Sequence, residues 1–213
     1  MDRLDASQIS VPGLEARVVD RCTSTNTLLR EELSAGGGAL HGASAVLLAA
    51  ELQTAGRGRQ GRRWRSARGA GATFSIRRPM RCEQRRLAGL SIAVGVSSAR
   101  ALRRLGARGV ALKWPNDLMV NRRKLGGILI ETRPLPRPDG RRAPGSMVIV
   151  GIGINCRAQP RFGARLGRGV AALDEVMPRP VSRNAVIGAV AREVMGALAV
   201  WERAWERAGG AAA

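Results

Sequence analysis

Apolar and polar side chains along this chain repeat with a period of two in some stretches and of about 3.6 in others. Residues 14–20 alternate apolar and polar side chains, which predicts a half-buried strand, and the apolar residues 45–50 predict a buried strand. Further strands are predicted over residues 72–76, ended by Pro79, and over residues 109–114, 118–120, 124–131 and 146–155. The Pro-, Arg- and Gly-rich residues 133–145 predict an exposed connection.

Three stretches follow the helical period. Residues 27–33 predict a short helix that the hydroxyl of Ser24 or Thr25 can cap. Residues 83–105 predict a helix with one apolar stripe, formed by Leu87, Leu90, Val94, Ser98, Leu102 and Leu105. Residues 183–205, capped by Ser182, predict a last helix with the stripe Val186, Val190, Val194, Leu198 and Trp201. The stripe of the helix over residues 83–105 indicates core packing rather than chemistry.

Residues 53–64, directly after the predicted buried strand, have the most distinctive composition. Three glycines alternate there with four arginines: Gly56, Gly58 and Gly61 with Arg57, Arg59, Arg62 and Arg63. Glycine lets a backbone approach a ligand closely, and a guanidinium group binds phosphate or carboxylate through paired hydrogen bonds. The segment therefore predicts a flexible clamp for an anion. The alternatives are a solvated loop and a disordered tether for nucleic acid, which usually runs longer and repeats.

A predicted hairpin carries the only two lysines among the 36 basic residues, Lys113 and Lys124. A compact ammonium group differs in geometry from guanidinium, so both lysines are candidates for positions where arginine does not serve, unless they survive by chance. Asp117 lies between them in a Pro-Asn-Asp sequence typical of turns. The double glycine Gly126-Gly127 indicates a bulge or the close approach of another group.

Composition limits the classes of function. The 213 residues suffice for one domain, and the net charge of +20 favours acidic partners, but the arginines are spread along the whole chain and do not indicate DNA binding. No apolar run approaches the ~20 residues of a membrane span and no signal peptide is visible, so a cytoplasmic protein without membrane contact is expected. Three separated cysteines and one histidine, His41, predict reduced thiols and argue against zinc or Ser-His-Asp chemistry.

Five motifs occur in one order along the chain. They are Ser24-Thr25-Asn26, Gln53-x-x-Gly56-Arg57-Gly58-Arg59-x-Gly61-Arg62-x-Trp64, Lys113-Trp114-Pro115-Asn116-Asp117, Lys124-Leu125-Gly126-Gly127-Ile128-Leu129-x-Glu131 and Gly151-Ile152-Gly153-Ile154-Asn155. With these motifs the chain resembles the catalytic domain of biotin–protein ligases over about residues 14–205. The resemblance implies an α+β fold, a mixed β-sheet with helices packed on one side, like the class II aminoacyl-tRNA synthetase core.

The resemblance also implies a two-step reaction. Biotin and ATP, with Mg²⁺, first give biotinyl-5′-AMP and pyrophosphate, and biotin then passes to one lysine of a biotin carboxyl carrier protein. Two anions must be joined, so positive charge is needed to cancel their repulsion and to stabilise the transition state. The anion clamp and Lys124 supply such charge. A glycine-jointed loop can also shield the reactive adenylate from water.

Residue roles are carried over from the matching motifs. The expected biotin-binding residues are Ser24, Thr25, Asn26 and Gln53, with Arg57, Gly58 and Arg59 around the carboxylate and the α-phosphate. Lys124, placed between these two groups, is the first candidate for a catalytic residue, together with Arg59 and Asp117. The expected ATP-side residues are Arg59, Arg62, Trp64, Asn116, Asp117 and Asn155. Asp117 either holds magnesium or takes the proton of the acceptor lysine, Lys113 is structural or contacts phosphate, and no dedicated metal site is expected.

We expect no counterpart here of two further domains that relatives contain. Bifunctional members begin with a winged-helix DNA-binding domain and many members end with an SH3-like domain. Here we expect one catalytic domain, residues 1–213, with an extension over residues 1–13, a tail over residues 206–213, no repressor function, and a monomer or homodimer. Three alternatives stay open: a lipoate or octanoate transferase of the same superfamily, a ligase that binds biotin without turnover, and a non-catalytic nucleic-acid-binding protein.

Overall fold

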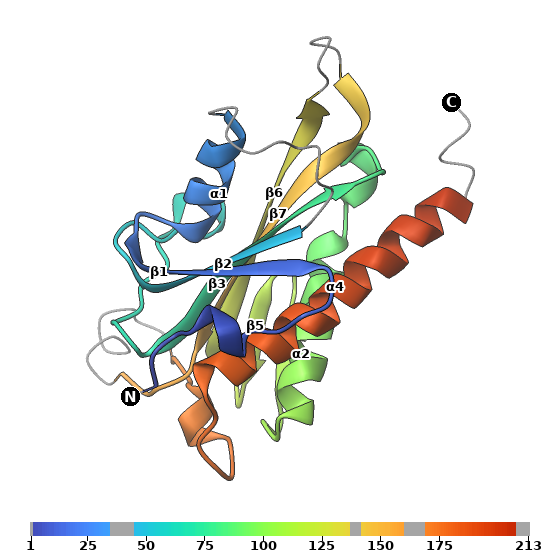
Figure 1. Cartoon of the computed structure of the whole chain (residues 1–213). Coiled ribbons are helices and arrows are strands. Elements are labelled where there is room, and N and C mark those ends of the chain that lie inside the picture. The colour runs from blue at the N-terminus through green and yellow to red at the C-terminus, as the bar shows by residue number, and fades with distance from the viewer. Residues whose placement is uncertain (1, 35–44, 137–141, 160–168, 208–213) are drawn as a thin grey trace.

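A seven-stranded sheet organises the computed structural model, which describes residues 2–34, 45–136, 142–159 and 169–207 (Figure 1). The strands lie in the order β1-β2-β3-β7-β6-β5-β4. β1 and β2 are parallel and all other neighbours are antiparallel, so the sheet is mixed, as predicted. The strands are β1 (Leu14–Cys22), β2 (Ala45–Gln53), β3 (Gly71–Met80), β4 (Ala111–Lys113), β5 (Asp117–Val120), β6 (Arg123–Pro136) and β7 (Arg142–Asn155).

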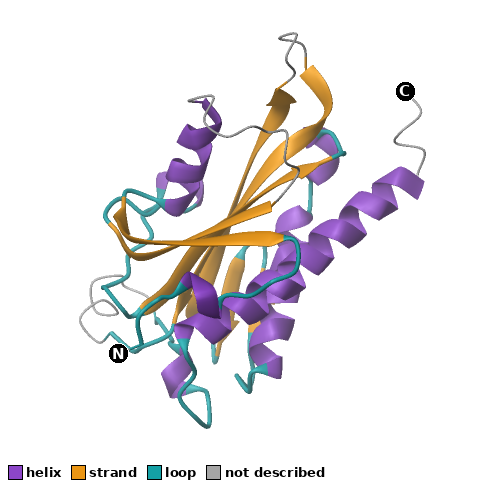
Figure 2. Ribbon diagram, in the orientation of Figure 1, coloured by secondary structure: helices purple, strands orange, loops and turns teal. Residues whose placement is uncertain are grey.

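Within the described residues, three α-helices cover the two faces of the sheet (Figure 2). They are α1 (Thr25–Ser34), α2 (Leu90–Arg104) and α4 (Arg183–Arg207), with short 3-10 turns η1 (Ala6–Gln8), η2 (Arg59–Gly61), η3 (Gln84–Leu87) and η4 (Leu173–Glu175). The main core lies between the sheet and the pair α2 and α4, and it contains the apolar stripes predicted for both helices. The α+β class and the mixed sheet are therefore confirmed.

The short helix α1 lies on the opposite face, which the expectation of helices on one side did not include (Figure 1). Strand β2 explains the difference, because it is apolar at successive positions and so has two apolar faces. Its residue Leu47 belongs to the core under α4, whereas Val46 and Leu48 pack with Leu29 of α1. The remainder of this second face, beyond α1, is open to the site described below.

Several elements differ in extent from the sequence predictions. Strand β3 continues through Pro79, because β2 pairs with β3 only as far as Arg77 and the prolyl nitrogen therefore needs no partner on that side. The predicted connection over residues 133–145 is partly strand: β6 runs on to Pro136 and β7 starts at Arg142. The helix predicted from residue 83 starts only at Leu90, because Gly89 adopts a left-handed conformation with φ of 88°.

The N-terminal segment is tied to α4 and β2 by charged groups. The Arg183 side chain is 1% exposed, and it donates to Glu51 at 2.7 and 3.1 Å and to the carboxylate of Asp2 at 3.2 Å. Glu51 also accepts from the backbone amide of Leu4 at 2.6 Å. Burial tends to raise the pKa of Glu51, but the bonds and charge of Arg183 outweigh burial and lower it. The first residues thus belong to the folded unit.

By length and composition alone, α4 is the one helix in the described ranges that could cross a membrane. The core helix of a soluble protein satisfies the same test. Here the stripe Val186, Val190, Val194 and Leu198 is buried in the main core. The packing of α4 against β3 and α2 therefore accounts for its apolar composition.

Candidate active site

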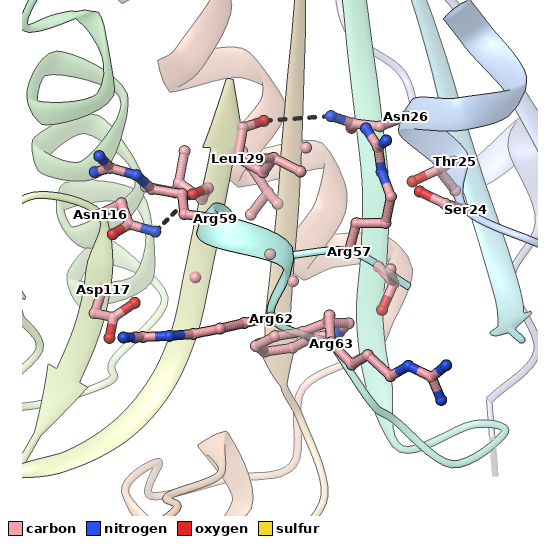
Figure 3. A pocket seen from close by; sticks show the side chains of 18 of the residues that line it. Ser24, Thr25, Asn26, Arg57, Arg59, Arg62, Arg63, Asn116, Asp117 and Leu129 are labelled. Atoms are coloured by element: carbon pink, nitrogen blue, oxygen red, sulfur yellow. Dashed lines mark hydrogen bonds between the residues drawn. The ribbon is translucent and has the colours of Figure 1, made fainter. Parts of the chain in front are cut away.

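A cavity of about 260 Å³ lies on the face of the sheet that carries α1 (Figure 3). All but one of the predicted site residues line it: Ser24, Thr25, Asn26, Gln53, Arg57, Gly58, Arg59, Arg62, Trp64, Asn116, Asp117 and Lys124. These residues come from the start of α1, the end of β2, the loop before β3, and the β5–β6 hairpin. The fold therefore brings four separate motifs to one place.

Small residues form the floor of this cavity. Thr73 of β3, Gly127 of β6, and Gly151 and Gly153 of β7 line the cavity. Their neighbours Phe74, Ile152 and Ile154 belong to the main core, as alternation along a strand requires, and Phe74 and Ile152 also contribute atoms to the cavity lining. A Cβ atom added at Gly151 would overlap the amide of Asn26, and one added at Gly153 would overlap the Trp64 indole. The glycines predicted to mark a close approach thus make room for these two side chains.

One end of the cavity is a network of polar side chains. The Gln53 side-chain oxygen accepts from the backbone amide of Thr25 at 2.7 Å and from its hydroxyl at 3.0 Å. The Thr25 hydroxyl also lies 2.6 Å from the hydroxyl of Ser75, which donates to Asn26 Oδ1 at 2.5 Å. Thr25 is the first residue of α1, and its hydroxyl bonds to side chains of the sheet rather than capping the helix. Buried groups satisfied in this way are held in fixed positions.

The glycine- and arginine-rich loop before β3 is a compact hairpin. An isolated bridge joins Arg57 to Arg63, and the Gly58 amide donates to the Arg62 carbonyl at 2.7 Å. The Trp64 amide closes the loop on the Gly56 carbonyl at 2.9 Å. A Cβ atom at Gly56 would come within 2.6 Å of the Trp64 carbonyl oxygen, so only glycine fits there. The backbone aims the arginines in different directions.

Figure 3 shows how these arginines divide the cavity. Arg57 extends toward Asn26, at the polar end, where its guanidinium forms an ion pair with Glu131 of β6. Arg59 extends toward Asn116, and Arg62 toward Asp117. Within the described part of the chain, neither Arg59 nor Arg62 has a carboxylate within ion-pair distance. Their charge is directed to the end opposite Asn26.

The cationic end of the cavity contains Lys124 and Asp117, the basic and the acidic residue of the predicted hairpin. Lys124 Nζ lies 2.6 Å from Asp117 Oδ1, and both side chains are largely buried. Asn116 donates to the Ile128 carbonyl at 2.9 Å and accepts from the Ile128 amide at 3.0 Å, which fixes the turn against β6. Lys113 also lines the cavity and pairs in register with Asp117. Lys124 thus holds its ammonium group against the Asp117 carboxylate, and Lys113 lies on the neighbouring strand with an exposed side chain.

Asn155 is the predicted site residue that the cavity lining does not include. Its amide donates to the backbone carbonyls of Lys124 at 3.4 Å and Ala171 at 3.1 Å. It therefore lies behind Lys124 and supports the strand that carries it. His41 lies outside the described residues.

Two residues that hold the cavity together had no role in the sequence predictions. Ser75 links Thr25 to Asn26, and its only sequence signal is a polar position inside an apolar strand. Glu131 was part of a motif, but nothing in the motif indicated that its carboxylate contacts Arg57 and Asn26. Both contacts depend on strand pairing between distant segments.

The charge of the cavity is strongly positive. Among the described residues that line it, Asp117 is the one carboxylate, against six cations: Arg57, Arg59, Arg62, Arg63, Lys113 and Lys124. Among the described residues, no three His, Cys, Asp or Glu side chains come together as a metal site would require. The cavity is suited to a ligand that carries several negative charges at one end and neutral polar groups at the other.

Comparison with known proteins assigns the chain to a family. A model described as the biotin/lipoate A/B protein ligase family matches residues 18–155. The chain belongs to this family. The resemblance deduced from the five motifs is thereby confirmed, and the matched residues include the whole cavity lining.

Members of the biotin/lipoate ligase family with curated names are similar over most of this chain. The "Bifunctional ligase/repressor BirA" of Escherichia coli is 35% identical over 204 residues, which cover 94% of this chain and 59% of that protein. The "Biotin--[acetyl-CoA-carboxylase] ligase" of Mycobacterium tuberculosis is 32% identical over 196 residues, 88% of this chain and 65% of that protein. The chain thus spans about three fifths of the length of these relatives.

Solved structures of the family have the same fold. The biotin protein ligase of Aquifex aeolicus, in complex with biotin and ATP, has a TM-score of 0.66 and 27% identity over 88% of this chain and 72% of that one. The Leishmania major enzyme in complex with biotinyl-5-AMP has a TM-score of 0.68, covers 88% of this chain and 76% of that one, and at 22% identity shows the fold alone.

Proposed function

We propose that this member of the biotin/lipoate ligase family is an ATP-dependent biotin ligase. In the first step a biotin carboxylate oxygen attacks the α-phosphorus of ATP, and pyrophosphate leaves. In the second step the ε-amine of a carrier-protein lysine attacks the acyl carbon, the acyl–oxygen bond to AMP breaks, and the amine loses a proton. Biotin, ATP with Mg²⁺ and a biotin carboxyl carrier protein are the substrates in this proposal.

One observation carries this proposal: a single cavity joins a neutral polar network to a cluster of cations. Thr25, Asn26 and Gln53 offer fixed donors and acceptors to an uncharged polar group. Arg59, Arg62 and Lys124 line the other part and suit a carboxylate beside a polyphosphate. Relatives in complex with biotin and ATP have the same fold, which supports this pair of substrates.

In the adenylation step the chain supplies position and charge. We expect Lys124 to bridge the acyl carboxylate and the α-phosphate; its position in the cavity lining and its largely buried ammonium group support this role. We expect Arg59 and Arg62 to offset the charge of the phosphates, and the direction of both side chains supports this. Asp117 holds Lys124 before the substrates bind, and in the second step it either takes the proton of the acceptor amine or helps to hold magnesium.

The test is biotin-dependent exchange of pyrophosphate into ATP, with wild-type protein beside Lys124→Ala. Exchange reports the first step alone and needs no carrier protein. We expect exchange in the wild type and a loss of about 100-fold or more in the variant, as for removal of a charged transition-state donor. Absence of exchange with intact biotin binding would leave a biotin-binding protein without turnover.

The family description also includes lipoate ligases, so the assay is repeated with lipoate and with octanoate in place of biotin. Exchange with either acid and none with biotin would replace the proposed substrate. A nucleic-acid-binding protein would instead show binding to DNA or RNA that weakens steeply with salt and is indifferent to Lys124→Ala.

A further inference from the structure

We propose that Glu131 is a positioning residue for the acyl substrate, because it fixes Arg57 and Asn26 together at the polar end of the cavity. In this arrangement Arg57 serves the polar end of the substrate rather than the phosphate that is attacked. The proposal rests on the proposed function for the identity of the two substrates. It assigns Glu131, which does not line the cavity itself, an effect on biotin and not on ATP.

Glu131 joins three segments that are distant in the sequence. Its Oε1 atom pairs with the guanidinium of Arg57, in the loop before β3, and lies 3.4 Å from Arg30 of α1. Its Oε2 atom accepts from Asn26 Nδ2, at the start of α1, at 2.8 Å. One carboxylate on β6 thus fixes two cavity-lining side chains through separate oxygen atoms.

The direction of Arg57 separates it from the other arginines of its loop. Its side chain extends toward Asn26, whereas Arg59 and Arg62 extend toward Asn116 and Asp117 (Figure 3). Its charge is also largely balanced by Glu131, with which it forms an ion pair. An arginine that is paired and turned away from the cationic end is a poor clamp for phosphate, but its remaining donors suit a neutral oxygen.

The Glu131 carboxylate is ionised over the neutral range. Burial tends to raise its pKa, but the hydrogen bonds from Arg57 and Asn26 and the charges of Arg57 and Arg30 outweigh burial and lower it. A charged acceptor bonds the Asn26 amide more strongly than a neutral one would. This bond leaves Asn26 Oδ1 directed to Ser75, which belongs to the polar network.

The chain contains a matched control, Glu32 of α1. Glu32 is also partly buried and also joins two arginines, Arg17 at 2.8 Å and Arg77 at 3.2 Å. It connects α1 to the sheet as Glu131 does, but neither Glu32 nor its two arginines line the cavity. A purely structural role of such a bridge would therefore give the same result at both positions.

The experiment compares Glu131→Ala, Glu131→Gln and Glu32→Ala with the wild type. The KM values for biotin and for ATP are measured by pyrophosphate exchange, and biotin binding is measured by calorimetry, which does not depend on turnover. For Glu131→Ala we expect the KM and the Kd for biotin to rise about tenfold or more, as for the loss of hydrogen bonds to a charged group, with the KM for ATP within about twofold. Glu131→Gln keeps an acceptor for Asn26 and should restore part of the affinity.

A double variant tests whether Glu131 acts on biotin binding through its ion pair with Arg57. Arg57→Ala and Glu131→Ala should not be additive, because each removes the same ion pair, so the double variant should bind biotin about as weakly as either single variant. The proposal is overturned if Glu131→Ala raises both KM values equally, leaves biotin affinity unchanged, or is matched by Glu32→Ala. A wild type that binds biotin without exchange would refute the proposed turnover but still test Glu131 by calorimetry. A wild type that binds no biotin would overturn both proposals.

Discussion

Lys124 Nζ and Asp117 Oδ1 are 2.6 Å apart, on neighbouring strands that a tight turn at Asn121 and Arg122 connects. The pair lies at the cationic end of the cavity, and the two groups are 17% and 23% exposed. A charged pair that is mostly removed from water keeps a long, flexible lysine in one orientation. The ammonium group is therefore in place before a substrate arrives.

We expect Asp117→Asn to slow pyrophosphate exchange about tenfold, because the charged acceptor of Lys124 is replaced by a neutral one of equal size.

Lys124→Arg should not restore the activity lost in Lys124→Ala. A guanidinium group spreads its charge over a wider plane on a longer side chain, so it cannot place a compact ammonium group 2.6 Å from Asp117 Oδ1. Exchange at the wild-type rate in Lys124→Arg would show that only net charge matters at this position.

Gly151→Ala tests the floor of the cavity. The added methyl group would overlap the amide of Asn26 and displace it, so we expect weaker biotin binding by calorimetry and a loss of about 1–3 kcal/mol in the free energy of unfolding. The control is Gly188→Ala in α4, where an added Cβ meets no atom within 4 Å. That substitution should stabilise the helix by about 0.5–1 kcal/mol and leave binding unchanged. Equal effects at both glycines would contradict the proposed contact.

Arg183→Ala tests the tie between the N-terminal segment and α4. It would leave the carboxylates of Glu51 and Asp2 without their buried partner, so we expect the free energy of unfolding to fall by about 3–5 kcal/mol in a urea titration. Arg68→Ala, which breaks an exposed pair with Asp20, should lower the free energy of unfolding far less, because water screens that pair. Similar values for the two variants would show that burial of Arg183 does not matter.

Three carboxylates that pair with arginines predict how the free energy of unfolding depends on pH. The pKa values of Glu51, Asp2 and Glu131 are lowered in the folded protein, because hydrogen bonds and arginine charges outweigh burial. The unfolded chain therefore binds more protons, and stability rises with pH. Their contribution should be complete above the ordinary value of 4.5 for glutamate and disappear as the pH falls through the lowered values. Unfolding free energies at pH 6, 4.5 and 3 check this, and Glu51→Gln should flatten the decline.

The three cysteines should resist alkylation in the folded protein. All are free thiols, and burial raises the pKa of Cys156 to about 12 and that of Cys22 to about 11, while the pKa of Cys82 is also raised. The thiolate is the reactive form, so labelling by iodoacetamide at pH 8 should be slow without denaturant and complete in urea. Rapid labelling of Cys156 without denaturant would show that the segment directly after β7 opens easily.

Most of the hydrophobic core could be predicted from the sequence, but the extent of the strands could not. The stripes of α2 and α4 were predictable, because Val94 or Val190 recurs with its neighbours at helical spacing and is fully buried. The long ends of β6 and β7 were not, because register pairing such as Arg133 with Met147 supplies backbone bonds that composition does not reveal. Pro79 was misread for the same reason, since its neighbours in space decide whether a strand tolerates it.

The site was predicted by motif and completed by contacts across the sheet. Lys124 and Asp117 are seven residues apart, and the hairpin that joins them was visible in the sequence. Glu131 and Arg57 lie on different elements, and Ser75 contacts a helix about 50 residues away in the chain, so no local sequence pattern predicts either contact. The sequence indicates such residues only by a polar side chain at a strand position that faces the cavity.

The floor of the cavity constrains how the protein could be altered. At Gly127, Gly151 and Gly153 the sheet contributes no side chain to the cavity. An added Cβ would meet Lys124, Asn26 or Trp64, so any replacement there adds atoms and displaces side chains that line the cavity. No side chain can be shortened at these three glycines to admit a bulkier acyl group. A larger cavity would have to come from the loop before β3, where long lining side chains such as Arg63 can be shortened. The breadth of substrates that the protein can evolve to accept is therefore decided by its loop and not by its sheet.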